Sequence, residues 1–237
     1  ISRINASSQV ATATYTGVLV PTGLTSSNYN ISYTNGNYSI IPADRLKVTT
    51  ANQSVTYGTT PTYTTTAEYL DSHSNTIKVL TQTGSNNNYT FDDGAGTTIN
   101  LALKPYTGPH VAAQSTSGNT VVGIYDVKDL AYSQTGTNFN GTPVFTGVLS
   151  VNQKAITPTA GSVSKVYDGT TSMNNVVVGM NGKVSNDLVA ISSTGAFTQK
   201  NVGANLGYTI TGISLSAADA GNYYLSGGNA ISGNDGV

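Results

Sequence analysis

Hydrophobic and polar residues alternate in several stretches of this chain of 237 residues. Apolar side chains occupy near-alternate positions in residues 38–48, 187–198 and 208–216. A period of two places successive side chains on opposite faces of a strand, whereas a helix requires a period of about 3.6. These stretches are therefore predicted to be half-buried β-strands.

Turn-forming residues separate the alternating stretches at intervals of roughly 8–12 residues, a spacing typical of sandwiches and barrels. Asn and Gly tolerate positive φ angles, so tight turns are predicted at Asn35-Gly36, Asn140-Gly141 and Asn181-Gly182. The strongest helical candidate is residues 216–222, at most one or two turns long. We expect an all-β chain of tandem immunoglobulin-like sandwich modules. The alternative is β-grasp-like modules, each with one short helix.

Two landmarks recur in a fixed order along the chain, which indicates internal repeats. A Tyr-Gly or Tyr-Asp-Gly turn is followed later by an Asn-aromatic pair. Tyr57 and Tyr167 are 110 positions apart, and Asn28 and Asn138 are separated by the same number. The third Asn-aromatic pair is Asn222-Tyr223. The predicted organisation is the C-terminal part of a preceding β repeat in residues 1–43, a complete β module in residues 44–153 and a second module in residues 154–237.

The composition narrows the class of protein. Charged residues make up 9% of the chain, against roughly 25% in ordinary soluble domains, and the formal net charge is −1. Ser, Thr and Asn account for 85 residues, and Glu68 is the only glutamate. Surfaces of soluble helices are rich in Glu, Lys, Gln and Arg, so this composition excludes a helical protein. The scattered Lys and Arg residues exclude a nucleic-acid partner.

The sequence contains no cysteine, which excludes disulfides and thiolate metal sites. No apolar run approaches the roughly 18–20 residues of a membrane helix, so no membrane insertion is expected. The opening residues lack the pattern of a signal peptide, and the chain begins in mid-pattern. We interpret it as a fragment of a longer protein.

Few residues suggest chemistry. His73 and His110 lie in polar stretches without a second histidine nearby, so we interpret both as loop residues. Asp92-Asp93 precedes Gly94 and Gly96 and raises the question of a cation site, but the spaced ligands of a calcium loop are missing. A polar turn is favoured there. We expect no catalytic residues, no metal, no cofactor and no enzymatic activity.

The repeat landmarks are interpreted as a structural signature. In the Tyr-Asp-Gly turn we expect the tyrosine to pack on a core, the aspartate to accept hydrogen bonds from the backbone two residues on, and the glycine to adopt a positive φ angle. Asp219-Ala-Gly-Asn-Tyr has the spacing of the tyrosine corner of immunoglobulin-like sandwiches. The signature residues are Tyr57, Gly58, Tyr167, Asp168, Gly169, Asp219, Gly221, Asn222 and Tyr223.

The last repeat resembles the YDG domain. The motifs that carry this resemblance are VYDGTT in residues 166–171, KNVG in residues 200–203 and LSAADAGNYYL in residues 215–225. The middle repeat, with TYGTTP in residues 56–61 and VGIYDV in residues 122–127, is similar to the MBG repeat that accompanies YDG domains. Residues 28–43 resemble the end of another such repeat. Ser185-Asn186-Asp187 departs from the Gly-Asp-Asp that is usual in the YDG domain.

The resemblance implies a repeat region of a very large secreted adhesin of Gram-negative bacteria, of the filamentous-haemagglutinin type exported by two-partner secretion. It implies an extracellular or cell-surface location and a role in attachment and biofilm cohesion. Within such a protein the segment is expected to be a structural stalk in which neighbouring repeats of the same chain are the partners. The alternative is a module that binds host-cell or biofilm glycans or proteins, whose ligand-binding residues the sequence does not identify.

Overall fold

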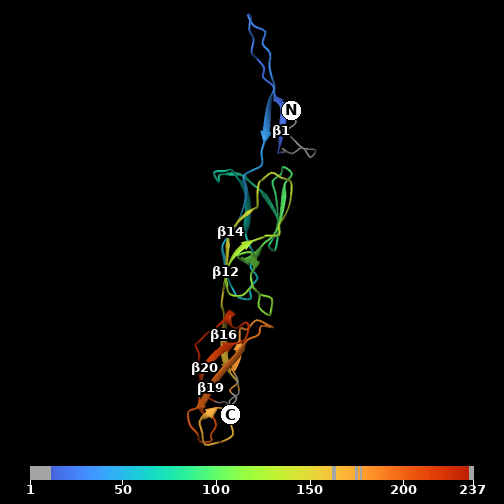
Figure 1. The fold of residues 1–237 in the computed structure, drawn as a ribbon. Coiled ribbons are helices and arrows are strands. Elements are labelled where there is room, and N and C mark those ends of the chain that lie inside the picture. The colour runs from blue at the N-terminus through green and yellow to red at the C-terminus, as the bar shows by residue number, and fades with distance from the viewer. Residues whose placement is uncertain (1–11, 162–163, 174–175, 177, 235–237) are drawn as a thin grey trace. The chain divides into compact units, whose positions relative to one another are not determined.

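The computed structural model describes residues 12–161, 164–173, 176 and 178–234, and Figure 1 shows the path of the chain. In this part of the sequence, the chain forms strands β1 to β22 and one short 3-10 helix, η1 (Ala220–Asn222). The predicted all-β fold class is confirmed, and η1 lies within the residues expected to be helical. The first 11 residues of the predicted N-terminal piece lie outside the described residues.

The chain divides into two compact units, each assembled from segments that are separated in sequence. The first unit comprises Ile1–Asn52, Thr62–His110 and Asp126–Val148. The second comprises Gln53–Pro61, Val111–Tyr125 and Leu149–Val237. The repeat boundaries predicted after residues 43 and 153 come from the period of the sequence. The division into compact units does not test them, and they remain predictions.

At the start of the first unit, β1 (Ala13–Leu19) and β2 (Gly36–Ile40) form an antiparallel pair. Gly36, which the sequence places in a tight turn, instead belongs to β2 and lies opposite Leu19. The prediction of a turn at Asn35-Gly36 is therefore wrong, because the glycine pairs within a strand. Positive φ angles at Gly141 (72°) and Gly182 (97°) agree with the other two predicted turns.

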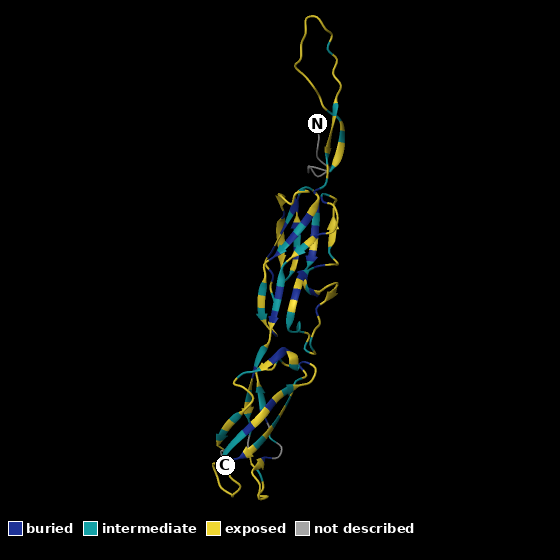
Figure 2. Ribbon diagram, turned by 60° about the vertical axis from the view of Figure 1, so that its left-hand side comes forward, coloured by how far each residue is buried: buried dark blue, intermediate teal, exposed yellow. Residues whose placement is uncertain are grey.

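Two four-stranded sheets make up most of the first unit, in the orders β14-β3-β5-β6 and β13-β9-β8-β7. The pairings are antiparallel except for β14, which lies parallel to β3. Each sheet has a buried face, because alternate residues of its central strands point inward (Figure 2). The strands are β3 (Arg45–Thr50), β5 (Thr65–Leu70), β6 (Thr76–Val79), β7 (Thr81–Ser85), β8 (Asn88–Asp92), β9 (Thr98–Ala102), β13 (Ser133–Thr135) and β14 (Val144–Thr146).

The core of the first unit is built from β-branched, leucine and aromatic side chains. Leu46 and Val48 on β3 and Phe91 on β8 are completely buried. Burial of such a side chain contributes roughly 2 kcal/mol to folding. The Tyr69 ring packs against Phe139, the aromatic member of the second Asn-aromatic pair, with 5.8 Å between ring centroids. This landmark is therefore part of a core.

A smaller ladder joins β10 (Lys104–Thr107) and β12 (Gly123–Lys128), which pair antiparallel with Tyr106 opposite Asp126. The short strand β11 (His110–Val111) follows β10. Tyr106 and Val127 are buried on this ladder, and the Lys128 ammonium lies 5.6 Å from the centroid of the Tyr106 ring. A cation at this distance from an aromatic face is weakly attractive.

The second unit contains a three-stranded sheet in the order β18-β16-β21 and a four-stranded sheet in the order β17-β19-β20-β22. Strand β15 lies parallel to β4, and β16 lies parallel to β21. Figure 1 labels β19 and β20 in the orange-to-red part of the chain, and it labels β16, whose residues fall in the yellow range of the colour bar, beside them. The strands are β4 (Gln53–Thr56), β15 (Val148–Asn152), β16 (Lys154–Ala160), β17 (Ser172–Met173), β18 (Val178–Asn181), β19 (Ala190–Phe197), β20 (Gly207–Ser216), β21 (Tyr223–Leu225) and β22 (Ile231–Asn234).

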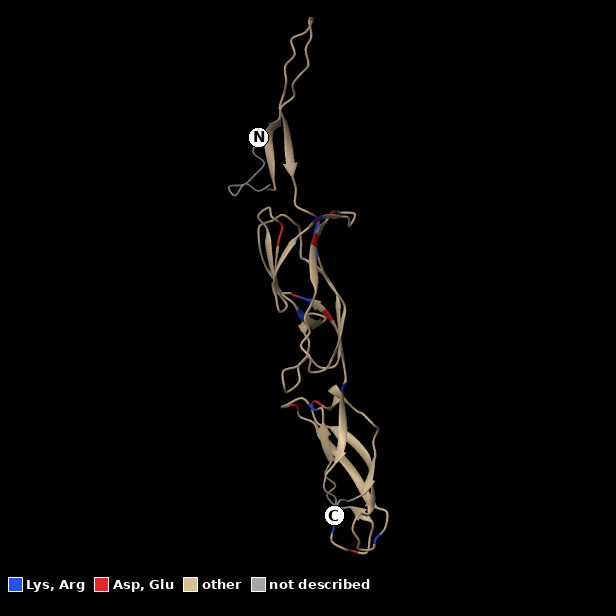
Figure 3. Cartoon of the chain, turned by 180° about the vertical axis from the view of Figure 1, so that it is seen from behind, with Lys and Arg blue, Asp and Glu red and all other residues tan. Residues whose placement is uncertain are grey.

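Charged side chains are sparse in both units, and the two signs are interspersed along the strands and loops (Figure 3). In the described part of the chain, ion pairs join Lys47 to Glu68, Lys128 to Asp126 and Lys165 to Asp168. The surface hydration therefore depends mainly on Ser, Thr and Asn. Four of the few carboxylates, Asp93, Asp129, Asp187 and Asp219, are nevertheless buried, and they identify the places where polar groups organise the fold.

Candidate functional site

The Tyr57-Gly58 turn is the first landmark of the second unit. It directly follows β4, and the Tyr57 backbone N–H donates to Asn152 O at 2.8 Å at the end of β15. The Thr59 N–H donates back to Thr56 O, and Gly58 has a φ angle of 83°, which favours glycine. This local geometry directs the tyrosine ring inward, and Tyr57 is completely buried.

A buried carboxylate receives the hydroxyl of this tyrosine. Tyr57 Oη lies 2.7 Å from Asp187 Oδ2, and Tyr223 Oη donates to the same oxygen. The two tyrosine rings meet edge to face with their centroids 5.3 Å apart. Ser115 Oγ lies 2.6 Å from Tyr57 Oη and extends the network. We call Tyr57, Ser115, Asp187 and Tyr223 the Asp187 cluster.

Hydrogen bonding determines the ionisation of the Asp187 cluster. Burial alone would raise the pKa of Asp187, but the effect of the nearby Ser117, Tyr223 and Tyr57 hydroxyls outweighs it and lowers the pKa of this carboxyl. Burial, followed by the hydrogen bond to Asp187, raises the pKa of the Tyr223 hydroxyl. At neutral pH the Asp187 carboxyl is therefore ionised and the Tyr223 hydroxyl is neutral. A carboxylate that accepts from neutral hydroxyl donors makes strong charge-assisted hydrogen bonds.

The turn around η1 adds a second set of contacts to segment Val111–Tyr125. Asp219 accepts hydrogen bonds from the backbone N–H of Thr116 at 3.2 Å and of Leu188 at 2.8 Å. Asn222 Oδ1 accepts from the Val122 N–H at 3.0 Å. Buried side-chain oxygens thus replace strand partners for backbone donors that would otherwise be unsatisfied. Of the remaining signature residues here, Gly221 belongs to η1 and its carbonyl accepts from Gln153 Nε2 at 3.0 Å.

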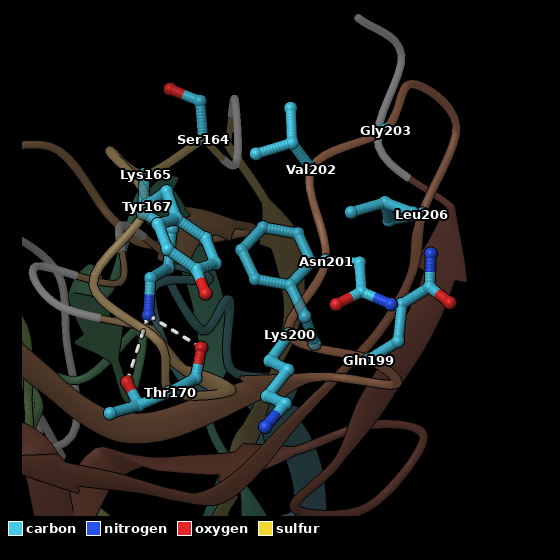
Figure 4. A pocket seen from close by; sticks show the side chains of 11 residues that line it. Ser164, Lys165, Tyr167, Thr170, Gln199, Lys200, Asn201, Val202, Gly203 and Leu206 are labelled. Atoms are coloured by element: carbon cyan, nitrogen blue, oxygen red, sulfur yellow. Dashed lines mark hydrogen bonds between the residues drawn. The ribbon is translucent and has the colours of Figure 1, made fainter.

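The Tyr167-Asp168-Gly169 turn has a different environment. Asp168 Oδ1 accepts hydrogen bonds from the Thr170 N–H at 2.9 Å and the Thr170 hydroxyl at 2.8 Å, and Gly169 has a φ angle of 75°. Lys165 Nζ lies 2.6 Å from the same oxygen and also donates to Thr170 O (Figure 4). The hydrogen bond from Lys165 is the first of the causes that lower the pKa of Asp168 to about 2.

The expected packing of Tyr167 on a core is corrected by the structure. The side chain is 60% exposed, and the preceding Val166 is 90% exposed. Residues 164–168 form no strand, so no alternating pattern turns the ring inward. The tyrosine instead lines a cavity of about 170 Å³ together with Lys200 and Val202 of the KNVG segment (Figure 4). The sequence motifs in residues 166–171 and 200–203 therefore meet at one surface.

The Asp92-Asp93 pair forms a polar turn. Asp92 accepts from the Gly94 N–H at 2.7 Å, while Asp93 accepts from the Ala95 N–H at 2.6 Å and from Asn138 Nδ2 at 2.8 Å. The oxygens are thus engaged in holding the turn against the second Asn-aromatic pair. Within residues 12–161, 164–173, 176 and 178–234, no group of three or more His, Asp or Glu side chains is arranged to hold a metal ion.

The histidines lie in loops or at the edge of a strand. His73 is exposed and donates its backbone N–H to Asp71 at 2.9 Å, and His110 is exposed in β11. No helix in the described sequence has the length and apolar character needed to cross a membrane.

Sequence reasoning missed Asp187 and Ser115 as members of the cluster. In the sequence, Asp187 is the last residue of a segment that departs from the family pattern and the first residue of the alternating stretch 187–198, and neither feature assigns it a buried contact. A carboxylate beside the apolar alternation of residues 188–191, in a chain with so few charges, is the signal that points to it. Ser115 is one of many serines in polar stretches and carries no such signal.

The strands, the turns and the Asp187 cluster define an all-β protein of small mixed and antiparallel sheets, organised by buried polar contacts at the turns. Within it, residues 152–230 match the family model of the YDG domain. This match includes the Tyr167-Asp168-Gly169 turn, the KNVG segment and the residues around η1. No curated protein and no solved structure matches the chain.

Proposed function

We propose that this chain is a structural repeat segment of a large bacterial adhesin, secreted or displayed at the cell surface, that spaces other parts of the adhesin for attachment and biofilm cohesion. Its role is mechanical rather than catalytic. Its partners are neighbouring repeats of the same chain, and the low charge gives it a hydrated surface without strong fields. The YDG domain in residues 152–230 supports this proposal.

The observation that carries the proposal is the Asp187 cluster. Segments Gln53–Pro61 and Val111–Tyr125 precede the YDG domain in sequence, yet they belong to the same compact unit. Tyr57 and Ser115 come from these segments, whereas Asp187 and Tyr223 come from the YDG domain. A spacer needs successive modules that do not swivel about a flexible linker, and buried charge-assisted hydrogen bonds restrain such motion.

We further propose that the repeats are immunoglobulin-like sandwiches. Support comes from the two four-stranded sheets of the first unit, each with one buried face. Tyr89 on β8 of one sheet donates to Tyr63 O, just before β5 of the other. Side chains that reach between two such faces are typical of a sandwich core.

Backbone relaxation measured by NMR tests the structural role. In the intact chain, the amides of residues 111–125 and those of β19 and β20 are expected to report the same rotational correlation time. The variant Asp187→Asn should shorten the correlation time of residues 111–125 relative to β19 and β20. Different correlation times in the unaltered chain would contradict a structural role for this junction.

A second candidate function is recognition of a glycan or a host protein at the Tyr167 turn. The observation that favours it is the cavity of about 170 Å³, which is bordered by the exposed residues Tyr167 and Val202 and by Lys200. An aromatic ring beside amide and ammonium groups has the chemistry of a sugar-binding surface.

Binding of the labelled, folded chain to host cells and to extracted biofilm polysaccharide separates the two functions. The structural proposal predicts no saturable binding above that of a heat-unfolded control. Saturable binding that is blocked by a soluble sugar and lost in Tyr167→Ala would establish the second candidate instead. The variant Tyr224→Ala is the matched control, because Tyr224 is also exposed and lies on β21 away from the residues that line the cavity.

A further inference from the structure

The two Tyr-Gly landmarks occupy equivalent places in the repeats but have opposite exposure. Tyr57 and Tyr167 are separated by the repeat spacing of 110 residues, and each precedes a glycine with a positive φ angle, 83° at Gly58 and 75° at Gly169. Tyr57 is completely buried, whereas Tyr167 is 60% exposed. The tyrosine of the same kind of turn is therefore buried at position 57 and exposed at position 167.

Residues of the following YDG domain contact the Tyr57 turn and bury it. Asp187 and Tyr223 engage the Tyr57 hydroxyl and ring. Val184 packs so closely on Gly58 that a Cβ atom there would lie 2.8 Å from Val184 Cγ2. Gly58 is thus part of an interface, and the close approach explains why a residue without a side chain is required there.

Each turn also has a neighbouring loop and a cavity. Beside the Tyr57 turn, residues 118–120 and 58–61 line a cavity of about 120 Å³. In the adjoining segment, Ser115 is hydrogen-bonded to Tyr57, and the Thr116 N–H donates to Asp219 of the YDG domain. Beside the Tyr167 turn, residues 200–203 line the cavity of about 170 Å³. Val202 in this loop is 83% exposed, and the Tyr167 hydroxyl makes no hydrogen bond to a described residue.

We propose that the Tyr167 turn and residues 200–203 form the docking surface for a following β-module on the same polypeptide, one that presents a carboxylate and a tyrosine as Asp187 and Tyr223 do. This inference rests on the proposed structural function. It extends that function by assigning the exposed YDG turn the role that the Tyr57-Gly58 turn has within the second unit. The partner is identified by continuity with an interface already present in the chain.

The end of the last strand is consistent with this docking. Strand β22 ends at Asn234, whose register partner on β20 is Gly207. Gly207 directly follows Leu206, which lines the cavity beside Tyr167. The described end of β22 is therefore paired with the residue that follows this part of the cavity lining, much as Asn152 at the end of β15 is hydrogen-bonded to Tyr57.

The test is an extended protein in which a second copy of residues 154–237 follows Val237 of the complete chain. Acetylation of tyrosine hydroxyls by N-acetylimidazole, read by mass spectrometry, reports their accessibility. Val166→Ile in the appended copy, at a position 90% exposed, distinguishes the peptides of the two copies by mass. Tyr57 and Tyr29, completely buried and 79% exposed, are the internal standards for protected and accessible hydroxyls.

Docking predicts that acetylation of the internal Tyr167 falls to the level of Tyr57, while the Tyr167 of the appended copy stays as reactive as in the unextended chain. Asp187→Asn placed only in the appended copy should restore the reactivity of the internal Tyr167. Equal reactivity of the two Tyr167 residues overturns the proposal. If the appended copy does not fold, the two Tyr167 residues are also acetylated equally. The proposal is then overturned as well, because the turn does not support a following module.

Binding of a second, separate copy of the chain to this surface is distinguished by its dependence on protein concentration. If Tyr167 of the unextended chain becomes protected as the protein concentration rises, the surface binds a second copy in trans and the tandem assignment is overturned. Failure of docking leaves the Asp187 cluster intact, so the relaxation experiment on residues 111–125 still decides the structural function separately. The two proposals therefore fail in distinguishable ways.

Discussion

The Tyr57-Gly58 turn and the Tyr167-Asp168-Gly169 turn show how one sequence landmark takes two structural roles. In the first, the tyrosine hydroxyl reaches a buried carboxylate 2.7 Å away and the glycine lies against Val184. In the second, the tyrosine is mostly exposed, and the aspartate and Lys165 hold the turn locally. The backbone conformation at glycine is similar in both, so the difference comes from what covers each turn.

This difference indicates what the extra aspartate of the second turn does. Asp168 accepts two hydrogen bonds from Thr170 and pairs with Lys165, which fixes the loop without help from another segment. The Tyr57-Gly58 turn lacks an aspartate and relies on Asp187 and Ser115, which come from other parts of the second unit. A turn whose conformation is held by its own hydrogen bonds and ion pair can stay exposed, and it can then bind a following module without refolding.

The largest effect is expected from removal of the shared carboxylate. Asp187→Ala leaves the buried Tyr223 hydroxyl without its acceptor and the Tyr57 hydroxyl with Ser115 alone, and it should lower the free energy of unfolding by about 3 kcal/mol. Urea denaturation followed by circular dichroism measures the change. Asp168→Ala is the matched control, and it should have a much smaller effect because its hydrogen bonds are local and exposed. Similar losses in the two variants would remove the distinction between the turns.

The two glycines provide the next comparison. Gly58→Ala places a Cβ atom in conflict with Val184 at a positive φ angle and should destabilise the chain by about 2 kcal/mol. Gly169→Ala has the same kind of backbone penalty but meets only Tyr167 Oη at 4.0 Å, so about 1 kcal/mol is expected. Thermal and urea unfolding of both variants checks the order. A larger loss at Gly169 would show that Val184 does not constrain Gly58.

Removal of the hydroxyl alone tests the hydrogen bond. Tyr57→Phe keeps the ring against Tyr223 but removes a donor to Asp187, and we expect a loss of about 1.5 kcal/mol. Tyr167→Phe removes a hydroxyl that has no partner among the described residues, and its effect should stay within about 0.5 kcal/mol. Equal effects of the two substitutions in urea denaturation would contradict the assigned environments.

The contribution of Asp187 also depends on pH. Its folded pKa lies below the ordinary value of 3.8, so its stabilisation is complete above pH 3.8 and is lost as the pH falls through the lower, folded pKa. The difference in unfolding free energy between the unaltered chain and Asp187→Asn should therefore be constant near neutral pH and decrease in acid. A difference that grows as the pH falls below 3.8 would contradict the lowered pKa.

The smallest effect concerns the exposed ion pair. Lys165→Met removes the principal cause of the low pKa of Asp168, so the carboxyl pKa should rise from about 2 toward 3.8. Carbon-detected NMR titration of the Asp168 carboxyl measures the midpoint. The control is Lys200→Met, which alters the same cavity but no ion pair of Asp168. An unchanged midpoint in Lys165→Met would show that Thr170 alone holds the turn.

Much of the fold follows from the sequence. Alternating stretches predicted β20 almost residue for residue, and the spacing of Gly and Asn predicted an all-β chain. These signals are local, because a strand with one buried face repeats its polarity every second residue. Gly36 shows the limit of such signals, since a glycine after asparagine fits both a turn and a strand, and pairing with Leu19 decides between them.

The candidate site was less predictable. The sequence identified both tyrosine turns, but it gave them the same role, because exposure depends on which segment covers a turn and not on the turn itself. Asp187 lies 130 residues from Tyr57 in sequence, and no local pattern encodes that contact. The cavity beside Tyr167 likewise requires residues 164–170 and 197–206 to meet in space.

Amide hydrogen exchange provides the most direct test that the segments before the YDG domain form one cooperative unit with it. The Tyr57 and Val122 amides donate to Asn152 O and Asn222 Oδ1. They are predicted to open with the same free energy as the buried Ile210 amide of β20, and all three should lose protection together in Asp187→Asn. Fast exchange of Tyr57 and Val122 beside a protected Ile210, unchanged by Asp187→Asn, would contradict this account.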